Sequence, residues 1–235
     1  MGRRRLLGLP REGGAIGVWV SGMAYGLVYA LLRGYDMMLL STALLGSIAT
    51  LFLVDWARYG SGFRRLVAIV APGVLLGFVV FDKFPWSIAL AAFEASLLAA
   101  SLQLKSLWRI VLGGGLLGGV GGFVALASPE CGIVESLLPG SYLLMATGFS
   151  GLRAVGVKRE TVTGFAIGLG MLTAFTVYYL LEGVFTIVLV LSLDVVSRVL
   201  GWLLGFYQSM RLRTYGFLEA FRTLVVMVLA GFLAG

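Results

Sequence analysis

The chain has 235 residues, a formal net charge of +7, 60% hydrophobic residues and 12% charged residues. Soluble domains contain roughly 45–50% apolar and about 25% charged residues, so this composition excludes an ordinary soluble enzyme, and its apolar content excludes a disordered chain. There is no His, and Cys131 is the one Cys. A Ser-His-Asp triad, an intrachain disulfide and a Cys-rich metal site are therefore excluded. The composition predicts an integral membrane protein whose first partner is the lipid bilayer.

The apolar segments of the chain are long and continuous. A helix needs about 20 mostly apolar residues to cross the hydrocarbon core of a membrane, whereas the strands of a membrane barrel alternate in hydropathy. The sequence therefore predicts an all-α, polytopic helical membrane protein with about nine transmembrane helices in a single domain, 1–235. The predicted spans are about 15–33, 36–55, 66–82, 86–104, 107–128, 136–154, 161–181, 184–206 and 215–234.

The basic residues are divided unequally between alternate loops. One set of loops, together with the N-terminal segment, carries most of the Lys and Arg residues. Cytoplasmic loops are the ones enriched in these residues, so we expect a cytoplasmic N-terminus, an odd number of spans and a location in the plasma membrane. Nucleic acid is not an expected partner, because no basic run has interleaved aromatic residues. The opposite loops hold Arg33 and Lys83 with Asp36, Asp82, Glu130, Glu135 and Glu182.

Glycine recurs at GxxxG spacing inside the predicted spans. Small residues let helices approach closely in a membrane, so we expect tight packing, with room for a ligand or a bend as the alternative for 113–122. Residues 113–118 also fit GxGxxG, but a dinucleotide site needs that motif between a strand and a helix. Pro72 is expected to kink the third span, and Pro139 to lie near the start of the sixth as a helix-entry residue. The glycine pairs are Gly22/Gly26, Gly73/Gly77, Gly114/Gly118, Gly118/Gly122, Gly164/Gly168 and Gly201/Gly205.

Ionisable residues inside the predicted spans are the main functional signal, because each costs about 2.5–3.5 kcal/mol on insertion scales. Glu94 lies in the middle of the fourth span with no basic residue within a turn. It could relay protons, bind a cation, or be a neutral hydrogen-bonded residue. Asp194 and Arg198 are four apart and Glu219 and Arg222 are three apart, so each pair lies on one helix face. Either each pair only neutralises itself, or the two pairs form a shared polar interior.

Further charged residues lie at the predicted cytoplasmic ends of the spans. Each arginine there could be a simple topology anchor, but together these residues predict an Arg-rich polar cavity open to the cytoplasm. Guanidinium groups suit carboxylate or phosphate, so we expect an anionic small molecule or a lipid headgroup as ligand, with no cofactor and no metal. The candidate ligand-binding residues are Arg11, Glu12, Asp55, Arg58, Glu94, Arg109, Arg153, Asp194, Arg198, Glu219 and Arg222.

Three short motifs resemble the YwiC-like family of multi-pass membrane proteins. Residues 9–15 (Leu-Pro-Arg-Glu-Gly-Gly-Ala) look like that family's Pro-Arg-Glu-His-Gly-Ala-Trp opening. Residues 148–160 are similar to its stretch ending in Lys-Ser-x-Ile-Arg-Glu, and residues 213–219 to its basic-x-x-Gly-x-x-Glu helix start. The resemblance implies that Arg11, Glu12, Arg153 and Glu219 belong to one site on the inner face. The family's His is replaced by Gly here, so a role for that imidazole cannot operate.

Two classes of function fit these observations. The first is a carrier for a small solute, with Glu94 as the coupling group and a homodimer as a possible requirement of so short a chain. The second is a membrane-embedded enzyme acting on an isoprenoid or lipid, since nine helices with a polar mouth look like UbiA-type prenyltransferases. Those enzymes hold magnesium with Asp-rich motifs, whereas Asp36, Asp55, Asp82 and Asp194 are not clustered here. A non-catalytic accessory role is the remaining alternative.

Overall fold

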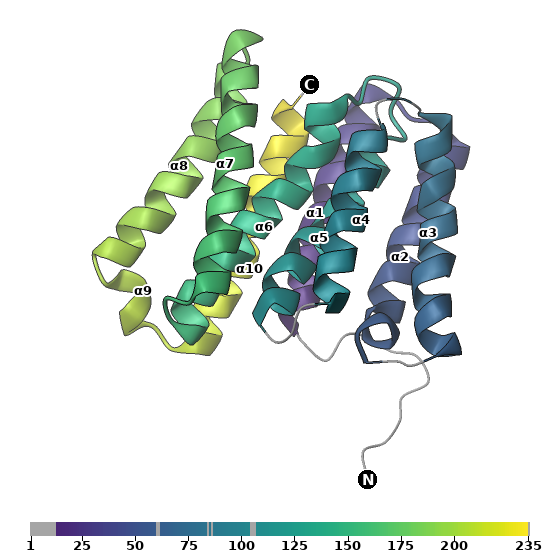
Figure 1. Ribbon diagram of the computed structural model, residues 1–235. Coiled ribbons are helices and arrows are strands. Elements are labelled where there is room, and N and C mark those ends of the chain that lie inside the picture. The colour runs from purple at the N-terminus through teal and green to yellow at the C-terminus, as the bar shows by residue number, and fades with distance from the viewer. Residues whose placement is uncertain (1–12, 60–61, 84, 86, 104–106, 235) are drawn as a thin grey trace.

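The computed structural model describes residues 13–59, 62–83, 85, 87–103 and 107–234, and for 13–14, 54–59, 100–103 and 107–110 it describes the backbone alone. Within these ranges the chain is all-helical, which confirms the all-α part of the prediction, and consecutive long helices run antiparallel (Figure 1). The helices are α1 (Gly13–Arg33), α2 (Met37–Tyr59), α3 (Phe63–Asp82), α4 (Ser87–Gln103), α5 (Leu107–Ala125), α6 (Ile133–Val155), α7 (Arg159–Leu181), α8 (Phe185–Leu203), α9 (Phe206–Ser209) and α10 (Leu212–Leu233).

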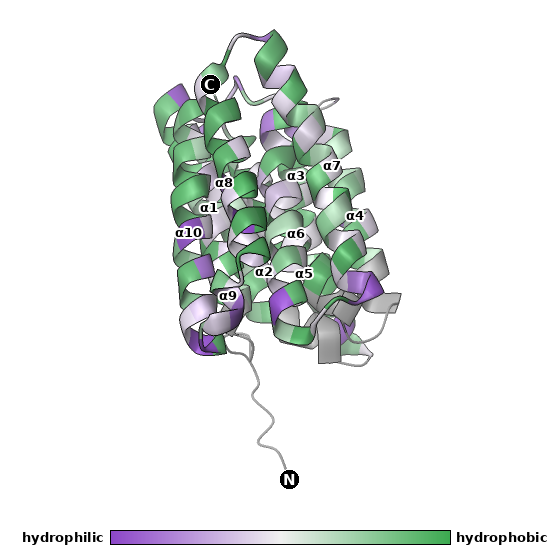
Figure 2. Ribbon diagram, turned by 90° about the vertical axis from the view of Figure 1, so that its left-hand side faces the viewer, coloured by the Kyte–Doolittle hydropathy of each residue, from purple (hydrophilic) through white to green (hydrophobic). Residues whose placement is uncertain are grey.

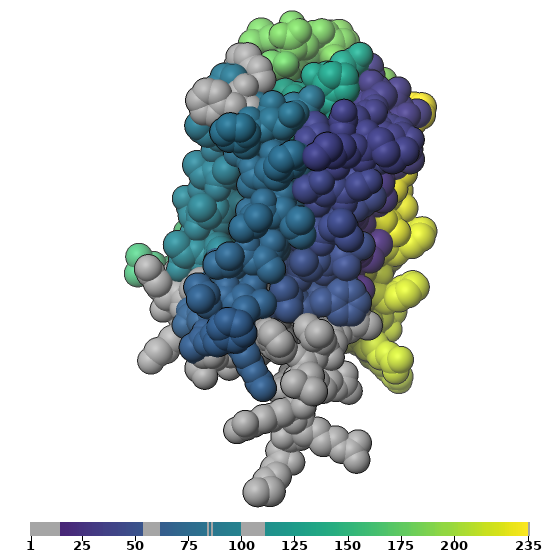
Figure 3. All heavy atoms as spheres, turned by 90° about the vertical axis from the view of Figure 1, so that its right-hand side faces the viewer, coloured from purple at the N-terminus to yellow at the C-terminus, as the bar shows by residue number. Residues whose placement is uncertain are grey.

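Five of the described helices are long and apolar enough to cross a membrane: α1, α3, α7, α8 and α10. Hydrophobic residues dominate along the long helices (Figure 2). Large apolar side chains, such as Leu193, Leu200 and Leu203 on α8, are exposed on the outside of the bundle. An outward-facing apolar surface is costly in water and favourable in lipid. The molecule is therefore a helical membrane protein. Figure 3 shows one such outer face, which α2 and α3 cover side by side.

The centre of the bundle is α5, which contacts α1, α2, α4, α6 and α7. Its glycines allow this crowding, as the GxxxG spacing predicts. A Cβ placed on Gly22 of α1 would overlap the carbonyl oxygen of Gly118, and a Cβ on Gly121 would overlap that of Gly22. The pair Gly73/Gly77 on α3 differs, because a Cβ there would meet nothing described within 4 Å. Tight packing is thus found around α5 but not on that face of α3.

The start of α6 departs from the prediction for Pro139. Glu135 Oε2 accepts a hydrogen bond from the Gly132 backbone N–H at 3.1 Å, and the helix begins at Ile133. The prediction of Pro139 as a starting residue was wrong, since it lies inside α6. A proline removes the N–H that would bond the carbonyl four residues earlier. That carbonyl belongs to Glu135, and it accepts the Tyr25 hydroxyl at 2.8 Å instead.

Two other differences also concern the ends of helices. The eighth predicted span, 184–206, is interrupted: α8 ends at Leu203, and Gly205 has a φ of 72°. A left-handed glycine commonly ends a helix, and the short α9 follows it. Glu135, expected in a loop, is instead a buried residue in the first turn of α6.

Cys131 lies in the turn between α5 and α6, where Ala127 accepts a backbone hydrogen bond from Asp36 at 2.9 Å. Burial raises the pKa of the Cys131 thiol, the Glu135 carboxylate raises it further, and Lys83 lowers it. Only the thiolate is nucleophilic, so we expect iodoacetamide to alkylate the native protein far more slowly at neutral pH than the SDS-unfolded chain. The native rate should begin to rise at a higher pH than the unfolded rate. Equal rates, measured by intact mass, would contradict this prediction.

Candidate functional site

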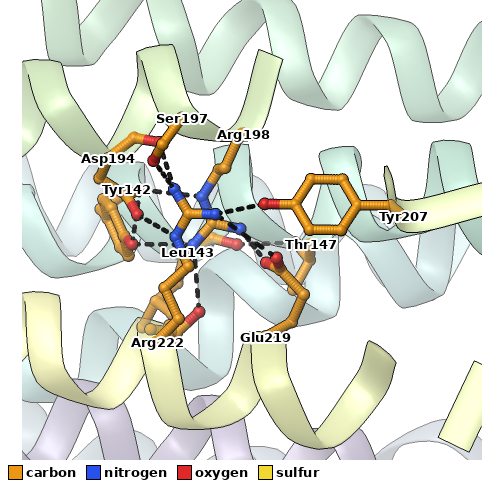
Figure 4. Close-up of polar contacts among 10 residues, drawn as sticks. Tyr142, Leu143, Thr147, Asp194, Ser197, Arg198, Tyr207, Glu219 and Arg222 are labelled. Carbon is orange, nitrogen blue, oxygen red and sulfur yellow. Dashed lines mark hydrogen bonds and ion pairs between the residues drawn. The ribbon is translucent and has the colours of Figure 1, made fainter. Parts of the chain in front are cut away.

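The two predicted ion pairs meet inside the bundle and exchange partners. Arg198 on α8 is fully buried; its Nε lies 2.8 Å from Asp194 Oδ2, and its Nη1 pairs with Glu219 Oε2 on α10. Arg222 on α10 reaches back to α8, where its Nε lies 2.6 Å from Asp194 Oδ1 (Figure 4). Two guanidinium groups and two carboxylates thus form one cluster with no net charge. We call these four residues the α8–α10 charge cluster.

Polar side chains from neighbouring elements complete the hydrogen bonding of the cluster. The Tyr142 hydroxyl of α6 donates to Asp194 Oδ2 at 2.9 Å and accepts from Arg198 Nη2 at 3.0 Å. The Tyr207 hydroxyl of α9 accepts from Arg222 Nη1 at 2.6 Å. Each nitrogen of the two guanidinium groups therefore has a described protein partner. The remaining acceptors are Thr223 for Arg198, and Ser197 with the Asp194 carbonyl for Arg222.

Sequence reasoning missed the tyrosines of this site. Charged residues inside a span attract notice because insertion is costly, whereas Tyr142 and Tyr207 are neutral and separated by 65 positions. No spacing rule links a residue of α6 to one of α9. The signal that could have helped is physical: two arginines have more N–H groups than two carboxylates can accept well, so further acceptors must be present.

Arg153 lies near α9 but bonds backbone carbonyls rather than the charge cluster. Its Nε donates to the Tyr207 carbonyl at 2.8 Å, and its Nη2 donates to the carbonyls of Met210 at 2.9 Å and Gln208 at 3.2 Å. These carbonyls lie at the end of a helix, where backbone acceptors lack helical partners. Arg153 therefore fixes the α9 segment to the end of α6.

Five other predicted site residues cannot be placed. Arg11 and Glu12 lie outside the described residues, and the side chains of Asp55, Arg58 and Arg109 do as well. The predicted cluster of arginines at the cytoplasmic mouth therefore stays a prediction. Among the side chains that are described, the ones brought together are those of the α8–α10 charge cluster.

Glu94 is separate from the charge cluster. It lies near the middle of α4, is 7% exposed, and its Oε1 is buried without a hydrogen-bond partner. A Cβ on Gly119 of α5 would overlap Oε1, and a Cβ on Gly140 of α6 would lie 3.2 Å from it. The carboxyl group thus occupies a notch between two helices that glycine alone leaves open.

A cavity of about 390 Å³ lies between α1, α5, α6 and α10, borders the charge cluster at Glu219, and is also lined by Thr223, a partner of Arg198. Its walls are largely glycine, alanine, valine and leucine, and they include Gly113 and Gly114 of the glycine-rich segment. Such a volume is within the usual range of small-molecule sites. The glycines of α5 thus pack closely on α1, and Gly113 and Gly114 also line the cavity.

The polar groups of the cavity wall gather on α10 and the facing part of α6. Glu219 Oε1 is buried without a hydrogen bond, and Arg222 Nη1 lies 3.8 Å from it, which is too far for one. The Tyr215 hydroxyl is buried beside Ser150, and no hydrogen bond of good geometry satisfies it. Unsatisfied buried polar atoms are rare and need an explanation; here they lie at the wall of a cavity.

Comparison of the chain with protein-family models, curated proteins and solved structures gave no match. The resemblance to the YwiC-like family therefore stays a hypothesis. Among the described residues, no three His, Cys, Asp or Glu side chains are grouped so that they could hold a metal ion. The function must be argued from the cavity and the buried charges themselves.

Proposed function

We propose that this protein is a carrier of a small solute, which binds in the cavity between α1, α5, α6 and α10. The observation that carries the proposal is the cavity itself, which adjoins a buried charge cluster inside a helical membrane protein. Substrate sites of carriers are typically enclosed by spanning helices with a few polar groups to orient the solute. Small residues on α1 and α5 also let these helices shift against each other without large side chains to displace.

The proposal includes about nine spans in the plasma membrane with the N-terminus in the cytoplasm. In support, the connections α6–α7 and α9–α10, the end of α2 and the start of α3 lie at the end of the bundle where α1 begins (Figure 1). Arg65, Lys158, Arg159, Arg211 and Arg213 belong to these connections or to the adjoining helix turns. Cytoplasmic loops carry such an excess of basic residues. The cavity lies in this half of the bundle, since it is lined by the first turns of α1 and α10.

The wall of the cavity favours a neutral solute. The charge cluster already balances its two arginines with two carboxylates, so an ionic solute would introduce a charge with no counter-charge into apolar surroundings, at a high cost. A mainly apolar body would match the glycine and alanine wall. A hydroxyl or amide N–H on the solute could donate to Glu219 Oε1 after a small side-chain rotation. We therefore propose a neutral, mainly apolar solute that has a hydrogen-bond donor.

A cavity-filling variant tests this function. Ala220 lines the cavity and its side chain is not buried. Ala220→Leu therefore adds volume at the cavity wall without replacing a buried residue. We expect native mass spectrometry of the detergent-purified wild type to show a co-purified small molecule, and at least about tenfold less of it in Ala220→Leu, which corresponds to about 1.4 kcal/mol of binding. Proteoliposomes should take up that molecule when they contain the wild type.

The matched control is Ala166→Leu, an exposed alanine on α7 that does not line the cavity. It should retain as much of the molecule as the wild type. If Ala220→Leu retained the molecule equally well, the cavity would not be its binding site. If the molecule were retained but never crossed the liposome membrane, the protein would bind it without carrying it.

A further inference from the structure

Among the described residues, no hydrogen-bond donor reaches Oε1 of Glu94 in its notch. Oε1 lies where a Cβ of Gly119 would be and close to where a Cβ of Gly140 would be, and the ring of Phe93 packs at the same place on Gly140. None of these offers a hydrogen-bond donor at Oε1, which has no partner. An ionised carboxylate in apolar surroundings is far costlier than a neutral one. The notch therefore fits the protonated acid.

The helices packed against α4 supply no counter-charge. α4 contacts α3, α5 and α6. On α5 the one ionisable residue is Arg109, about 15 Å along the helix axis from Gly119 at 1.5 Å per residue. On α3 the ionisable residues lie at the two ends: Arg64 and Arg65 in the first turn and Asp82 as the last residue.

The ionisable residues of α6 have other partners. Glu135 bonds the Gly132 N–H and the Tyr179 hydroxyl, and Tyr142 bonds Asp194 and Arg198. Arg153 bonds the carbonyls of the α9 segment. Among the described side chains, Glu94 thus forms no ion pair with any helix that touches α4.

We propose that Glu94 is a proton-binding site and that loss of its proton separates α4 from the notch formed by Gly119 and Gly140. A proton neutralises the carboxyl group and needs no extra space. The notch has no space for a larger ligand. Glu94 is 7% exposed, so the residue is not completely sealed inside the bundle. When the proton leaves, the charge has no partner in the notch, so the side chain must move toward water and displace α4.

This site does not depend on the solute or on the cavity. α5 stands between the two: Gly114 and Leu117 line the cavity, while Gly119 faces Glu94. The proton site can therefore be tested without adding a solute. Failure of this test would leave the proposed carrier function untouched, and failure of the uptake experiment would leave the proton site untouched.

The test uses dicyclohexylcarbodiimide, an apolar reagent that reacts with protonated carboxyl groups. The carboxyl oxygen adds to the central carbon of the reagent, and the carboxyl proton passes to a carbodiimide nitrogen. The resulting O-acylisourea rearranges to a stable N-acylurea, so nothing leaves and no further reactant is required. We expect mass spectrometry of peptides from the wild type to locate the adduct at Glu94, in a yield that falls as the pH is raised.

Two variants complete the design. Glu94→Gln should lose the adduct completely, together with the infrared C=O band of a protonated carboxyl group. Glu135→Gln is the control, because Glu135 is a buried carboxylate with two donors and should not be the labelled site. The absence of an adduct at Glu94 in the wild type would overturn the proposal, and so would a yield that is the same at every pH. The decisive readouts come from the wild type, so they do not require the variants to fold.

Discussion

Arg198→Met should lower the stability of the protein by about 3–5 kcal/mol, because it leaves two buried carboxylates to share one arginine. Arg198 is fully buried and is the group that pairs with both Asp194 and Glu219. Methionine has a similar length and no charge, so most of the loss would come from the uncompensated carboxylates rather than from a void. Unfolding in detergent with increasing SDS, followed by circular dichroism, measures the change.

The double variant Arg198→Met/Glu219→Gln tests whether the uncompensated carboxylate causes the loss of stability. It restores a balance of one acid and one base, since Asp194 and Arg222 remain paired at 2.6 Å. It should therefore be more stable than Arg198→Met alone, although it carries one more substitution. Arg213→Met is the control for an exposed arginine and should change stability by less than about 0.5 kcal/mol. If Arg198→Met cost no more than Arg213→Met, the charge cluster would not hold α8 to α10.

Gly121→Ala should also have a large effect and should lower the free energy of unfolding by about 1–3 kcal/mol. The added Cβ would overlap the carbonyl oxygen of Gly22. Backbone cannot rotate away as a side chain can, so α1 and α5 would have to move apart along their whole contact. A lower midpoint of thermal unfolding in detergent measures this loss.

Gly170→Ala on α7 is the control, and we do not expect it to lower the stability. A Cβ there meets nothing described within 4 Å, and alanine favours the helix over glycine by up to about 1 kcal/mol. Gly170→Ala should therefore leave the protein equally or more stable, whereas Gly121→Ala destabilises it. Equal losses in the two variants would show that the contact between α1 and α5 is not what makes glycine necessary at position 121.

Hydropathy and charge alone predict much of this fold. Each long helix begins and ends within a few residues of a predicted span, because the apolar segments are continuous and the breaks contain glycine, proline or charge. The errors occur where a single local contact decides. Glu135 fixes the start of α6 by bonding the Gly132 N–H, and Gly205 ends the eighth span early. Neither contact changes the hydropathy profile enough to be visible in it.

The site is predicted less completely than the fold. The i,i+4 and i,i+3 spacings correctly place two charges on one face of α8 and two on one face of α10. They do not show that Arg198 reaches Glu219, or that Tyr142 bridges Asp194 and Arg198, because those contacts depend on how three helices are packed. The glycine-rich segment 113–122 indicates room on α5, but the cavity itself depends on how four helices pack together.

The internal pairing of each helix has a consequence for synthesis of the protein at the membrane. Asp194 and Arg198 are in contact within α8, and Glu219 and Arg222 lie within 3.8 Å on α10. Each of these helices can therefore enter the lipid with its central charges already neutralised, which lowers the insertion cost of a lone charge. α8 leaves the ribosome before α10 does, and it needs no partner during that interval. The partner exchange that joins the two helices can then occur inside the membrane, after both have been inserted.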